Sequence, residues 1–179
     1  MITRIVIIML LISLFVCGCS DKHSPVQVSG ELEIGHYMIS PPKGYWYFPR
    51  KYLGKFKASN DIFLITFWKD KEAATRKDPD KMGAFFNFGV SENKFNNFDN
   101  YYNNASDSGI KYNNLPSEAS ILNTIDNWSC KQSDQGVYGI ECISLRDNLI
   151  TIGVYGNDKG LVFSKIPLLQ KVLESFKIE

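Results

Sequence analysis

The sequence is poor in the residues that build metal sites. It contains two histidines, His23 and His36, and four cysteines among its 179 residues. A zinc site needs several converging ligands, usually at short local spacings, and the sequence contains no such grouping. Asp78 and Asp80 form only a fragment of a calcium-binding loop, because the glycine and the distal glutamate of that loop are absent. We therefore expect no bound metal and no cofactor.

Sequence motifs of common enzyme classes are also missing. The chain has no Gly-x-Ser-x-Gly nucleophile turn, no phosphate-binding loop and no dinucleotide-binding glycine pattern. Catalytic carboxylates that converge only in the folded chain form no local motif. With that class left open, the sequence predicts a protein that is not an enzyme.

The charges are nearly balanced, with 20 Lys and Arg residues against 19 Asp and Glu residues. Loss of Arg4 with a cleaved leader would make the two numbers equal. Nucleic-acid binding usually needs a basic surplus or stripe, and electrostatic attachment to a membrane needs a cluster of basic residues. Neither is present, so we expect no nucleic-acid partner and no membrane attachment through charge.

One long apolar run lies near the N-terminus. It extends from Ile5 to Val16, directly after Arg4, and Ser13 is its only polar residue. A membrane-spanning helix needs about 20 apolar residues, so this run is too short to span a bilayer. A positive residue followed by a short apolar core is typical of a secretion signal. The alternative is a buried core helix, which would carry polar residues along one face.

The apolar run ends in Val16-Cys17-Gly18-Cys19, which resembles the lipobox of bacterial lipoproteins. In that motif an aliphatic residue and two small residues precede the cysteine that receives the lipid. Cys17 stands where Ala or Ser is usual, but its side chain is small. The resemblance implies cleavage between Gly18 and Cys19 and lipidation of Cys19. Acyl chains are a strong anchor, because each buried CH₂ contributes about 0.8 kcal/mol.

The lipobox implies a place in the cell envelope and a domain organisation. Residues 1–18 are then the signal peptide, residues 19–32 the lipidated N-terminus and a tether, and residues 33–179 one globular domain. Ser20 follows Cys19, and in lipoproteins this favours delivery to the periplasmic side of the outer membrane. Asp21, one position later, keeps the inner membrane open as an alternative.

Two cysteines remain in the expected mature domain. Cys17 would leave with the signal peptide and Cys19 would be acylated, so Cys130 and Cys142 are left as a pair. Exported compartments permit disulfides, and the turn signal at residues 133–136 would place the pair on adjacent antiparallel strands. We expect a Cys130–Cys142 disulfide. Two free buried thiols are the alternative.

Alternating, β-branched and aromatic segments predict a mostly antiparallel sheet. Strands are expected over residues 34–39, 52–58, 61–69, 84–90, 119–125, 137–145 and 149–155. Residues 69–81 are charged and are expected to form a surface loop. Residues 127–130 continue from the segment 119–125, and turns at residues 133–136 and 146–148 lead into the last two strands, which predicts an antiparallel meander.

A helix is expected between residues 95 and 109. Apolar side chains recur there at intervals of three or four, at Phe95, Phe98, Tyr102 and Ala105. Asn96 or Asn97 would cap its start, and Gly109 would end it. Aromatic and amide side chains together can form a sugar-binding surface. The alternative is that the aromatic side faces the core and the Asn-rich side faces solvent.

A second helix is expected at the C-terminus. Its apolar residues fall on one face, at Ile166, Leu169, Val172, Leu173 and Phe176. Ser164 is the expected N-cap, which would put Pro167 in the first turn, where the missing N–H costs little.

This order of elements is similar to the PsbP-like α/β/α sandwich, a family that includes small bacterial lipoproteins. The resemblance is carried by residues 37–47 (YMISPPKGYWY) and residues 168–177 (LLQKVLESFK). It implies an α+β fold in which an antiparallel sheet is flanked by helices. It does not imply a role in photosynthesis, because nothing in the sequence matches a specific photosystem contact or metal ligand.

Tyr45, Trp46, Tyr47 and Phe48 form a run of consecutive aromatic residues. Successive side chains of a strand point to opposite faces, so the run cannot be buried on one side alone. If Tyr45, Trp46 and Tyr47 are exposed together, they form a contact surface for an envelope protein partner. The alternative is that one side packs on the core and the other lies under the tether or a helix.

The sequence as a whole predicts a membrane-anchored envelope lipoprotein with a non-catalytic binding or structural role, facing the periplasm. The alternative is a small-ligand-binding or stress-related periplasmic lipoprotein.

Overall fold

The computed structural model describes residues 24–49, 63–76, 83–107, 109–134 and 136–178. The described strands form three antiparallel sheets of six, three and two strands. The six-stranded sheet is made, from one edge to the other, by β5 (Phe63–Phe67), β6 (Phe85–Glu92), β10 (Asn148–Gly156), β9 (Tyr138–Leu145), β8 (Ser129–Asp134) and β7 (Lys111–Asn113). The predicted α+β class with an antiparallel sheet is therefore confirmed.

The six-stranded sheet follows directly from the alternation of the sequence. In β6, Phe86, Phe88 and Val90 are buried on one face, and in β10 Ile150 and Ile152 join them. The strands expected at residues 84–90, 137–145 and 149–155 are confirmed, and β5 forms within the described part of the strand expected at 61–69. In the meander, β9 and β10 lie where they were expected, but the strand before them is β8 at residues 129–134 and not the segment 119–125.

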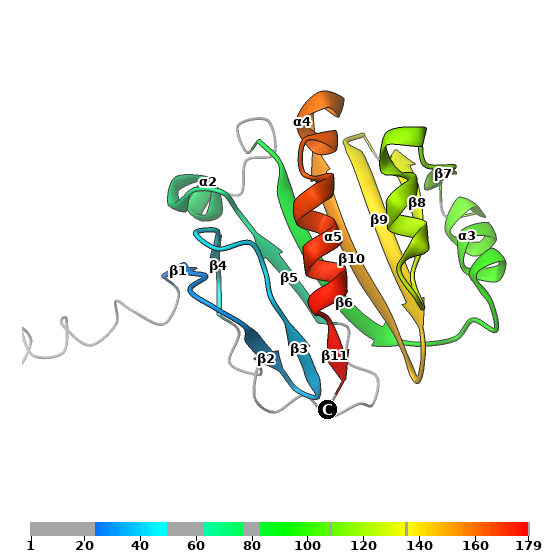
Figure 1. Cartoon of the computed structure of the whole chain (residues 1–179), viewed down its shortest axis with the longest axis horizontal. Coiled ribbons are helices and arrows are strands. Elements are labelled where there is room, and N and C mark those ends of the chain that lie inside the picture. Colours follow the sequence, from blue (N-terminus) through cyan, green and yellow to red (C-terminus); the bar gives the residue numbers. More distant parts are fainter. Residues whose placement is uncertain (1–23, 50–62, 77–82, 108, 135, 179) are drawn as a thin grey trace, which may run out of the picture.

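Helix α5 (Ile166–Ser175) covers one face of this sheet, with the three-stranded sheet of β2 (Leu32–Ile34), β3 (Tyr37–Ile39) and β11 (Lys177–Ile178) beside it (Figure 1). Ile166, Leu169, Val172 and Leu173 are buried between helix and sheet. We call this side of the six-stranded sheet the α5 face. It holds the larger of the two apolar clusters of the described chain, which we call the main core.

The start of the terminal helical region differs from the prediction. Pro167 lies in the first turn of α5 as expected, but Ser164 does not cap that helix. Ser164 instead ends a preceding short helix, α4 (Lys159–Phe163), whose own cap is Asp158, accepting from the Leu161 N–H at 2.6 Å. Asp158 is as good a capping residue as Ser164, so the helical region begins earlier and divides before Pro167.

Three further segments differ from the predicted secondary structure. The expected strand at residues 34–39 is the β2–β3 hairpin, because Gly35 adopts a φ of 65° and allows a tight turn. The expected loop at residues 69–81 contains helix α2 (Lys71–Arg76), capped by the Asp70 carboxylate. The expected strand at 119–125 is instead the 3₁₀ helix η2 (Ser117–Thr124), which buries Ala119 and Leu122. The strand expected at 52–58 lies outside the described residues.

The segment expected to be a tether takes part in the fold from residue 26. Strand β1 (Val26–Gln27) pairs with β4 (Trp46–Tyr47), and Val28 is buried in the main core. The Val28 N–H donates to the Tyr45 carbonyl at 2.7 Å. The apolar side chain of Val28 gains from this burial, which explains why the folded domain begins before residue 33.

The Cys130–Cys142 disulfide is confirmed. The two residues are direct partners on β8 and β9, their sulfur atoms are bonded, and their Cα atoms lie 4.0 Å apart. Both cysteines face the main core and fasten the meander at its centre.

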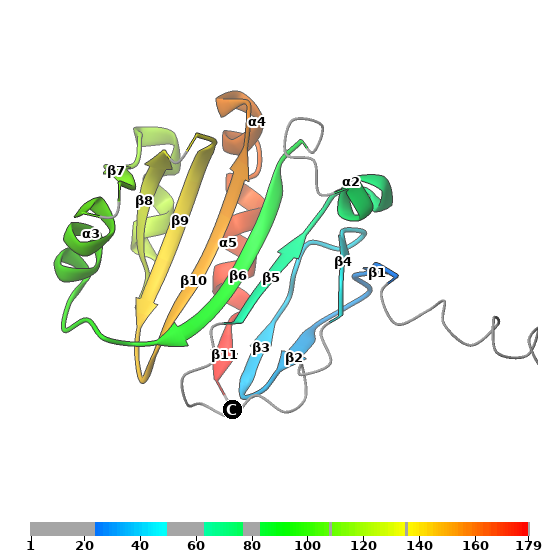
Figure 2. The same ribbon diagram turned by 180° about the vertical axis from the view of Figure 1, so that it is seen from behind.

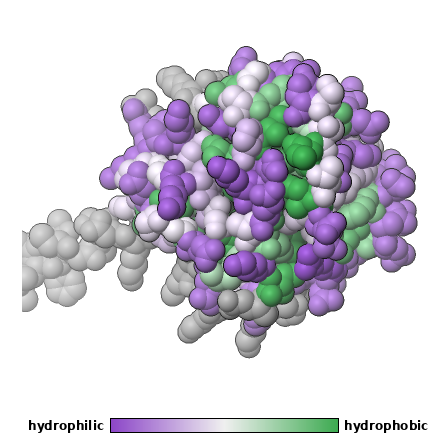
Figure 3. Space-filling view, in the orientation of Figure 1, coloured by the Kyte–Doolittle hydropathy of each residue, from purple (hydrophilic) through white to green (hydrophobic). Residues whose placement is uncertain are grey.

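The surface of the α5 face mixes polar and apolar side chains (Figure 3). The large apolar side chains that are exposed in the described ranges lie on separate elements, at Val26, Leu64, Ile121, Tyr138 and Ile178. No helix of the described ranges is long and apolar enough to cross a bilayer.

Candidate functional site

Tyr45, Trp46 and Tyr47 do not form the expected contact surface. Tyr45 and Tyr47 are 6% and 7% exposed and pack edge-on or tilted against Phe86 and Phe67 of the main core. Only Trp46 lies on the other side of β4, where Lys71 Nζ is 5.5 Å from its ring centroid. The exposed-surface hypothesis is therefore wrong for Tyr45 and Tyr47, and the alternative of core packing is confirmed for them.

The most distinctive polar site lies on the opposite face of the six-stranded sheet. Among the described residues, no helix covers the centre of this face, and α3 (Phe98–Asp107) lies at its β7–β8 side, as Figure 2 shows. We call it the α3 face. Tyr102 of α3 packs there on Ile143 and Leu149, in a second apolar cluster separate from the main core.

Glu141 is buried at the centre of the α3 face, with 7% of its surface exposed. One carboxylate oxygen, Oε1, accepts hydrogen bonds from the hydroxyls of Tyr101 at 2.9 Å and of Tyr112. The other oxygen, Oε2, accepts from the hydroxyl of Tyr155 at 2.6 Å. We call Glu141 and these three tyrosines the Glu141 cluster. Its members come from α3, β7, β9 and β10.

Two glycines make room for the third tyrosine of the cluster. Gly139 is the strand partner of Tyr155, and Gly153 is the partner of Glu141. A Cβ atom on Gly139 would lie 2.5 Å from Tyr155 Cδ1, and one on Gly153 would lie 2.7 Å from the Tyr155 hydroxyl. The Tyr155 ring therefore lies flat over both glycines, and this brings its hydroxyl to Glu141.

The tyrosines of the cluster are held in their neutral, hydrogen-donating form. Burial, and next the negative charge of Glu141, raise the pKa of Tyr101, Tyr112 and Tyr155 well above that of a free tyrosine. Burial also raises the pKa of Tyr102 to about 12. Each hydroxyl therefore remains a donor near neutral pH. Because three donors occupy the carboxylate, Glu141 is arranged as an acceptor that orders its neighbours and not as a free general base.

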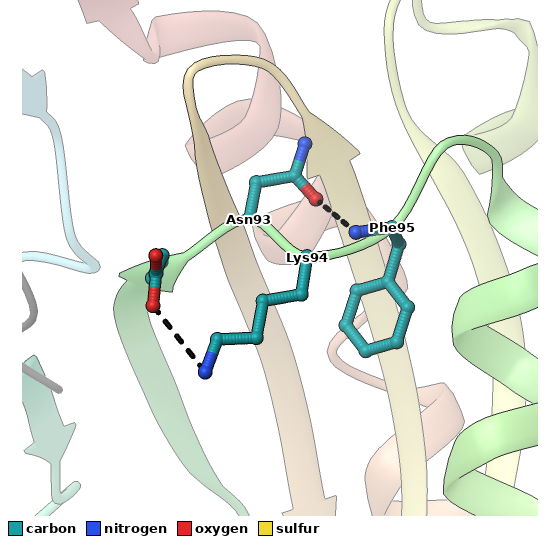
Figure 4. Close-up of polar contacts among 4 residues, drawn as sticks. Asn93, Lys94 and Phe95 are labelled. Atoms are coloured by element: carbon teal, nitrogen blue, oxygen red, sulfur yellow. Dashed lines mark hydrogen bonds and ion pairs between the residues drawn. The ribbon is translucent and has the colours of Figure 1, made fainter.

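A single polar residue docks the chain between β6 and α3. The Asn93 side chain donates from Nδ2 to the Arg146 carbonyl at 2.7 Å, and its Oδ1 accepts from the Phe95 N–H at 3.0 Å. Figure 4 shows this turn, together with the ion pair of Lys94 and Glu92 at 3.3 Å. Phe95 then packs edge-on against Tyr101. Asn93 thus connects the segment that precedes α3 to the β9–β10 hairpin through two hydrogen bonds.

The ends of α3 agree with the sequence prediction. The Asn97 side chain, and not Asn96, accepts from the Asn100 N–H at 2.9 Å. Gly109 follows the helix with a φ of 90°, and its N–H donates to the Ser106 carbonyl. The hydroxyl of Tyr102 donates to the Ser129 carbonyl at 2.9 Å, which fixes the helix against β8.

An open pocket of about 400 Å³ lies beside the Glu141 cluster, between the start of α3, η2 and β8. It is lined by Phe98, Asn114, Leu115, Ser120, Asn123, Trp128, Ser129, Cys130 and Lys131. Lys131 is the cross-strand partner of Glu141, and its Nζ lies 4.1 Å from the centroid of the Tyr102 ring. The pocket and the Glu141 cluster therefore meet at the paired residues Lys131 of β8 and Glu141 of β9.

The remaining predicted site residues do not converge on this place. Gly18, Cys19, Asp78 and Asp80 lie outside the described residues, and His36 is exposed at the turn of the β2–β3 hairpin. Within the described ranges, no three His, Cys, Asp or Glu side chains gather as a metal site would require.

Sequence reasoning missed the Glu141 cluster. One signal was present: Glu141 lies between Ile140 and Cys142 and is the only charged residue of a mostly apolar strand. A charge in such a strand needs partners, and tyrosine hydroxyls are suitable donors. No model of a known protein family matches this chain, and no curated protein matches it.

Proposed function

We propose that this chain is a lipid-anchored protein of the bacterial cell envelope, with a single non-catalytic binding domain held at the membrane surface. The observation that carries the proposal is the Val16-Cys17-Gly18-Cys19 sequence directly after a short apolar run. In this proposal Cys19 carries the lipid, and the domain faces the periplasm from the outer membrane. The Cys130–Cys142 disulfide supports export, because such bonds persist in oxidising compartments.

The chemistry of the α3 face supports a binding role over a catalytic one. A general base needs a carboxylate oxygen that can approach a substrate proton. Both oxygens of Glu141 instead accept from tyrosine hydroxyls. The cluster therefore serves as a rigid support for the surface around it.

The proposed fold family is the PsbP-like sandwich. What supports it is the antiparallel six-stranded sheet with α5 on one face and α3 beside the other. Folds of this kind serve many functions, so the binding role rests on the site and not on the fold.

Binding of a small ligand, rather than of an envelope protein, is favoured by one specific observation. The pocket beside Lys131 combines apolar, amide, hydroxyl and ammonium groups, which is the composition of many ligand sites. An envelope protein partner would instead need a contiguous exposed apolar patch, whereas the large exposed apolar side chains of the described chain lie on separate elements.

The anchor is tested by replacing the proposed lipidated residue. The Cys19→Ala variant should stay as an uncleaved precursor, take up no labelled acyl chain and lose its place in the outer-membrane fraction of a density gradient. The matched control is Cys17→Ala, which puts a usual lipobox residue at that position and should be processed normally. Normal processing and membrane retention of Cys19→Ala would contradict the proposal.

A further inference from the structure

The pocket between α3, η2 and β8 brings together three kinds of group. Asn114, Asn123, Ser120 and Ser129 contribute amides and hydroxyls, whereas Phe98, Leu115 and Trp128 contribute apolar walls. Lys131 contributes the positive charge. The volume of about 400 Å³ is near the lower end of the usual range for ligand sites, which suits a ligand of one or two rings.

The charge of Lys131 is available to a ligand because of the neighbouring cluster. Glu141 is its partner across the strand pair, but both carboxylate oxygens of Glu141 accept from tyrosine hydroxyls. The Lys131 ammonium instead lies over the face of Tyr102. A cation–π contact is weaker than a charge-assisted hydrogen bond to an anion, so an anionic group in the pocket would be the stronger partner.

The floor of the pocket is held in place by the fold. The backbone N–H of Cys130 donates to Asn123 Oδ1 at 2.8 Å, which fixes one pocket amide to β8. The Tyr102 hydroxyl holds the Ser129 carbonyl, and the disulfide holds Cys130 to β9. Ligand binding at this place would therefore require little ordering of the floor, and such preorganisation favours affinity.

We infer that this pocket binds a carboxylated N-acetyl sugar, an inference that rests on the proposed non-catalytic binding role in the envelope. The ammonium of Lys131 pairs with the carboxylate, and the amides and hydroxyls bind the acetamido and hydroxyl groups. Phe98 and Leu115 cover the apolar C–H face of the ring. The aromatic and amide side chains of the segment around α3 thus serve both roles that its sequence suggests, as Tyr102 packs inward and Phe98 lines the pocket.

The inference is tested with two sugars that differ in one group. The mature lipidated chain in detergent micelles is titrated with N-acetylmuramic acid and with N-acetylglucosamine, which lacks the carboxylate, and binding is followed by calorimetry. N-acetylmuramic acid should bind about tenfold more tightly, as expected for one added charge-assisted contact. Equal affinity for the two sugars, or no binding of either, would overturn the inference.

Matched variants locate the binding site. Lys131→Gln should weaken binding of N-acetylmuramic acid about tenfold and leave N-acetylglucosamine unchanged. The control is Lys111→Gln, an exposed lysine on the adjacent strand β7 that does not line the pocket. Circular dichroism checks that both variants are folded. Equal loss in Lys111→Gln, or no loss in Lys131→Gln, would overturn the assignment.

The same preparations separate this inference from the proposed function. Membrane fractionation of the unmodified chain reports on the lipid anchor and does not depend on the pocket. A chain that is anchored but binds neither sugar contradicts only the pocket assignment. A chain that is never lipidated contradicts the proposed function, whatever the sugars do.

Discussion

The two faces of the six-stranded sheet are stabilised in different ways. On the α5 face, apolar side chains such as Phe88 and Ile152 pack against Leu169 and its neighbours in one continuous cluster. On the α3 face, a buried carboxylate and three tyrosine hydroxyls stand at the centre, and the apolar cluster beside them is small. The first face gains from burial of apolar area, and the second depends on the geometry of specific hydrogen bonds.

Strand β9 shows how one segment serves both faces. Ile140 and Cys142 point to the main core, and Glu141 and Ile143 point to the α3 face, because side chains alternate along a strand. Desolvation of a buried charge without partners is costly. The three hydroxyl donors of the cluster offset this cost for Glu141, whereas the main core on the α5 face consists of apolar side chains. The stability of the α3 face therefore depends on the exact placement of its polar groups.

The largest effect is expected from emptying the α5 face at Phe88. This side chain is fully buried and contacts the rings of Tyr37 and Phe176. Phe88→Ala should lower the free energy of unfolding by about 3–5 kcal/mol, as large core truncations do. Urea unfolding measures it. The matched variant is Phe95→Ala beside the α3 face, where the ring is partly exposed and the loss should be clearly smaller. Equal losses would remove the distinction between the faces.

A somewhat smaller effect is expected from removing the disulfide. The bond lies on the α5 face but joins β8, which carries Lys131, to β9, which carries Glu141. Because the closed loop is short, replacing both cysteines by Ala should cost at most about 2–4 kcal/mol. Urea unfolding under oxidising conditions measures this cost. Reductant should destabilise the original chain but not the double variant, which has no disulfide to reduce. An equal loss in both would show that the disulfide does not account for the measured stabilisation.

Regular elements could be predicted where local pattern and burial agree. The strand around Ile65 alternates and is rich in β-branched and aromatic residues, and β5 forms there. Helix α3 follows its aromatic spacing and its Asn97 cap. In both cases the residues that define the local pattern are also those that the fold buries, so sequence and packing give the same answer.

The errors arose where two local signals compete. Ala119 and Leu122 are three residues apart and are buried on one side of η2, although the segment is apolar enough to suit a short strand. Asp158 and Ser164 are both good caps, and only packing decides which one begins a helix. Short apolar runs and alternative caps are therefore the weak points of local reasoning.

The Glu141 cluster lay beyond local reasoning for a different reason. Its hydroxyl donors come from residues 14, 29 and 40 positions away along the chain. Which of the nine tyrosines reach Glu141 is decided by strand order and register. The glycines that admit Tyr155 also have meaning only once β9 and β10 are paired. A lone carboxylate in an apolar strand predicts that partners exist, but not which ones.

A third, smaller effect is expected from removing one donor of the α3 face. Tyr155→Phe keeps the ring over Gly139 and Gly153 and deletes only the hydroxyl that donates to Glu141 Oε2. The loss of a hydrogen bond to a charged group should cost about 1.5–3 kcal/mol. The control is Tyr138→Phe, because Tyr138 is 41% exposed, and its effect should stay within about 0.5 kcal/mol. Equal effects in urea unfolding would show that the cluster adds no stability.

The smallest effect is expected from pH. The free energy of unfolding should be insensitive to pH near neutrality and should change only in alkaline solution. An unfolded tyrosine has a pKa of 10.0, whereas burial and the charge of Glu141 raise the pKa of Tyr101, Tyr112 and Tyr155 in the folded chain. Above pH 10.0 the unfolded chain therefore loses protons that the folded chain keeps, and the free energy of unfolding falls as pH rises. Below that pH all these hydroxyls are protonated in both states, and no change is expected.

Urea unfolding between pH 8 and pH 11.5 tests this response, since stability should stay level to about pH 9.5 and fall above the pKa of the unfolded tyrosines. The Tyr155→Phe variant has one fewer tyrosine with a raised pKa, so its free energy of unfolding should fall less steeply with pH than that of the original chain. The matched control is Tyr138→Phe, because it leaves every hydrogen bond of the Glu141 cluster in place. Tyr45 and Tyr47 of the α5 side also have a raised pKa, through burial alone, and contribute to the fall in every variant. The difference between the two slopes therefore isolates the α3 face, and identical slopes would contradict the protection of its tyrosines from ionisation.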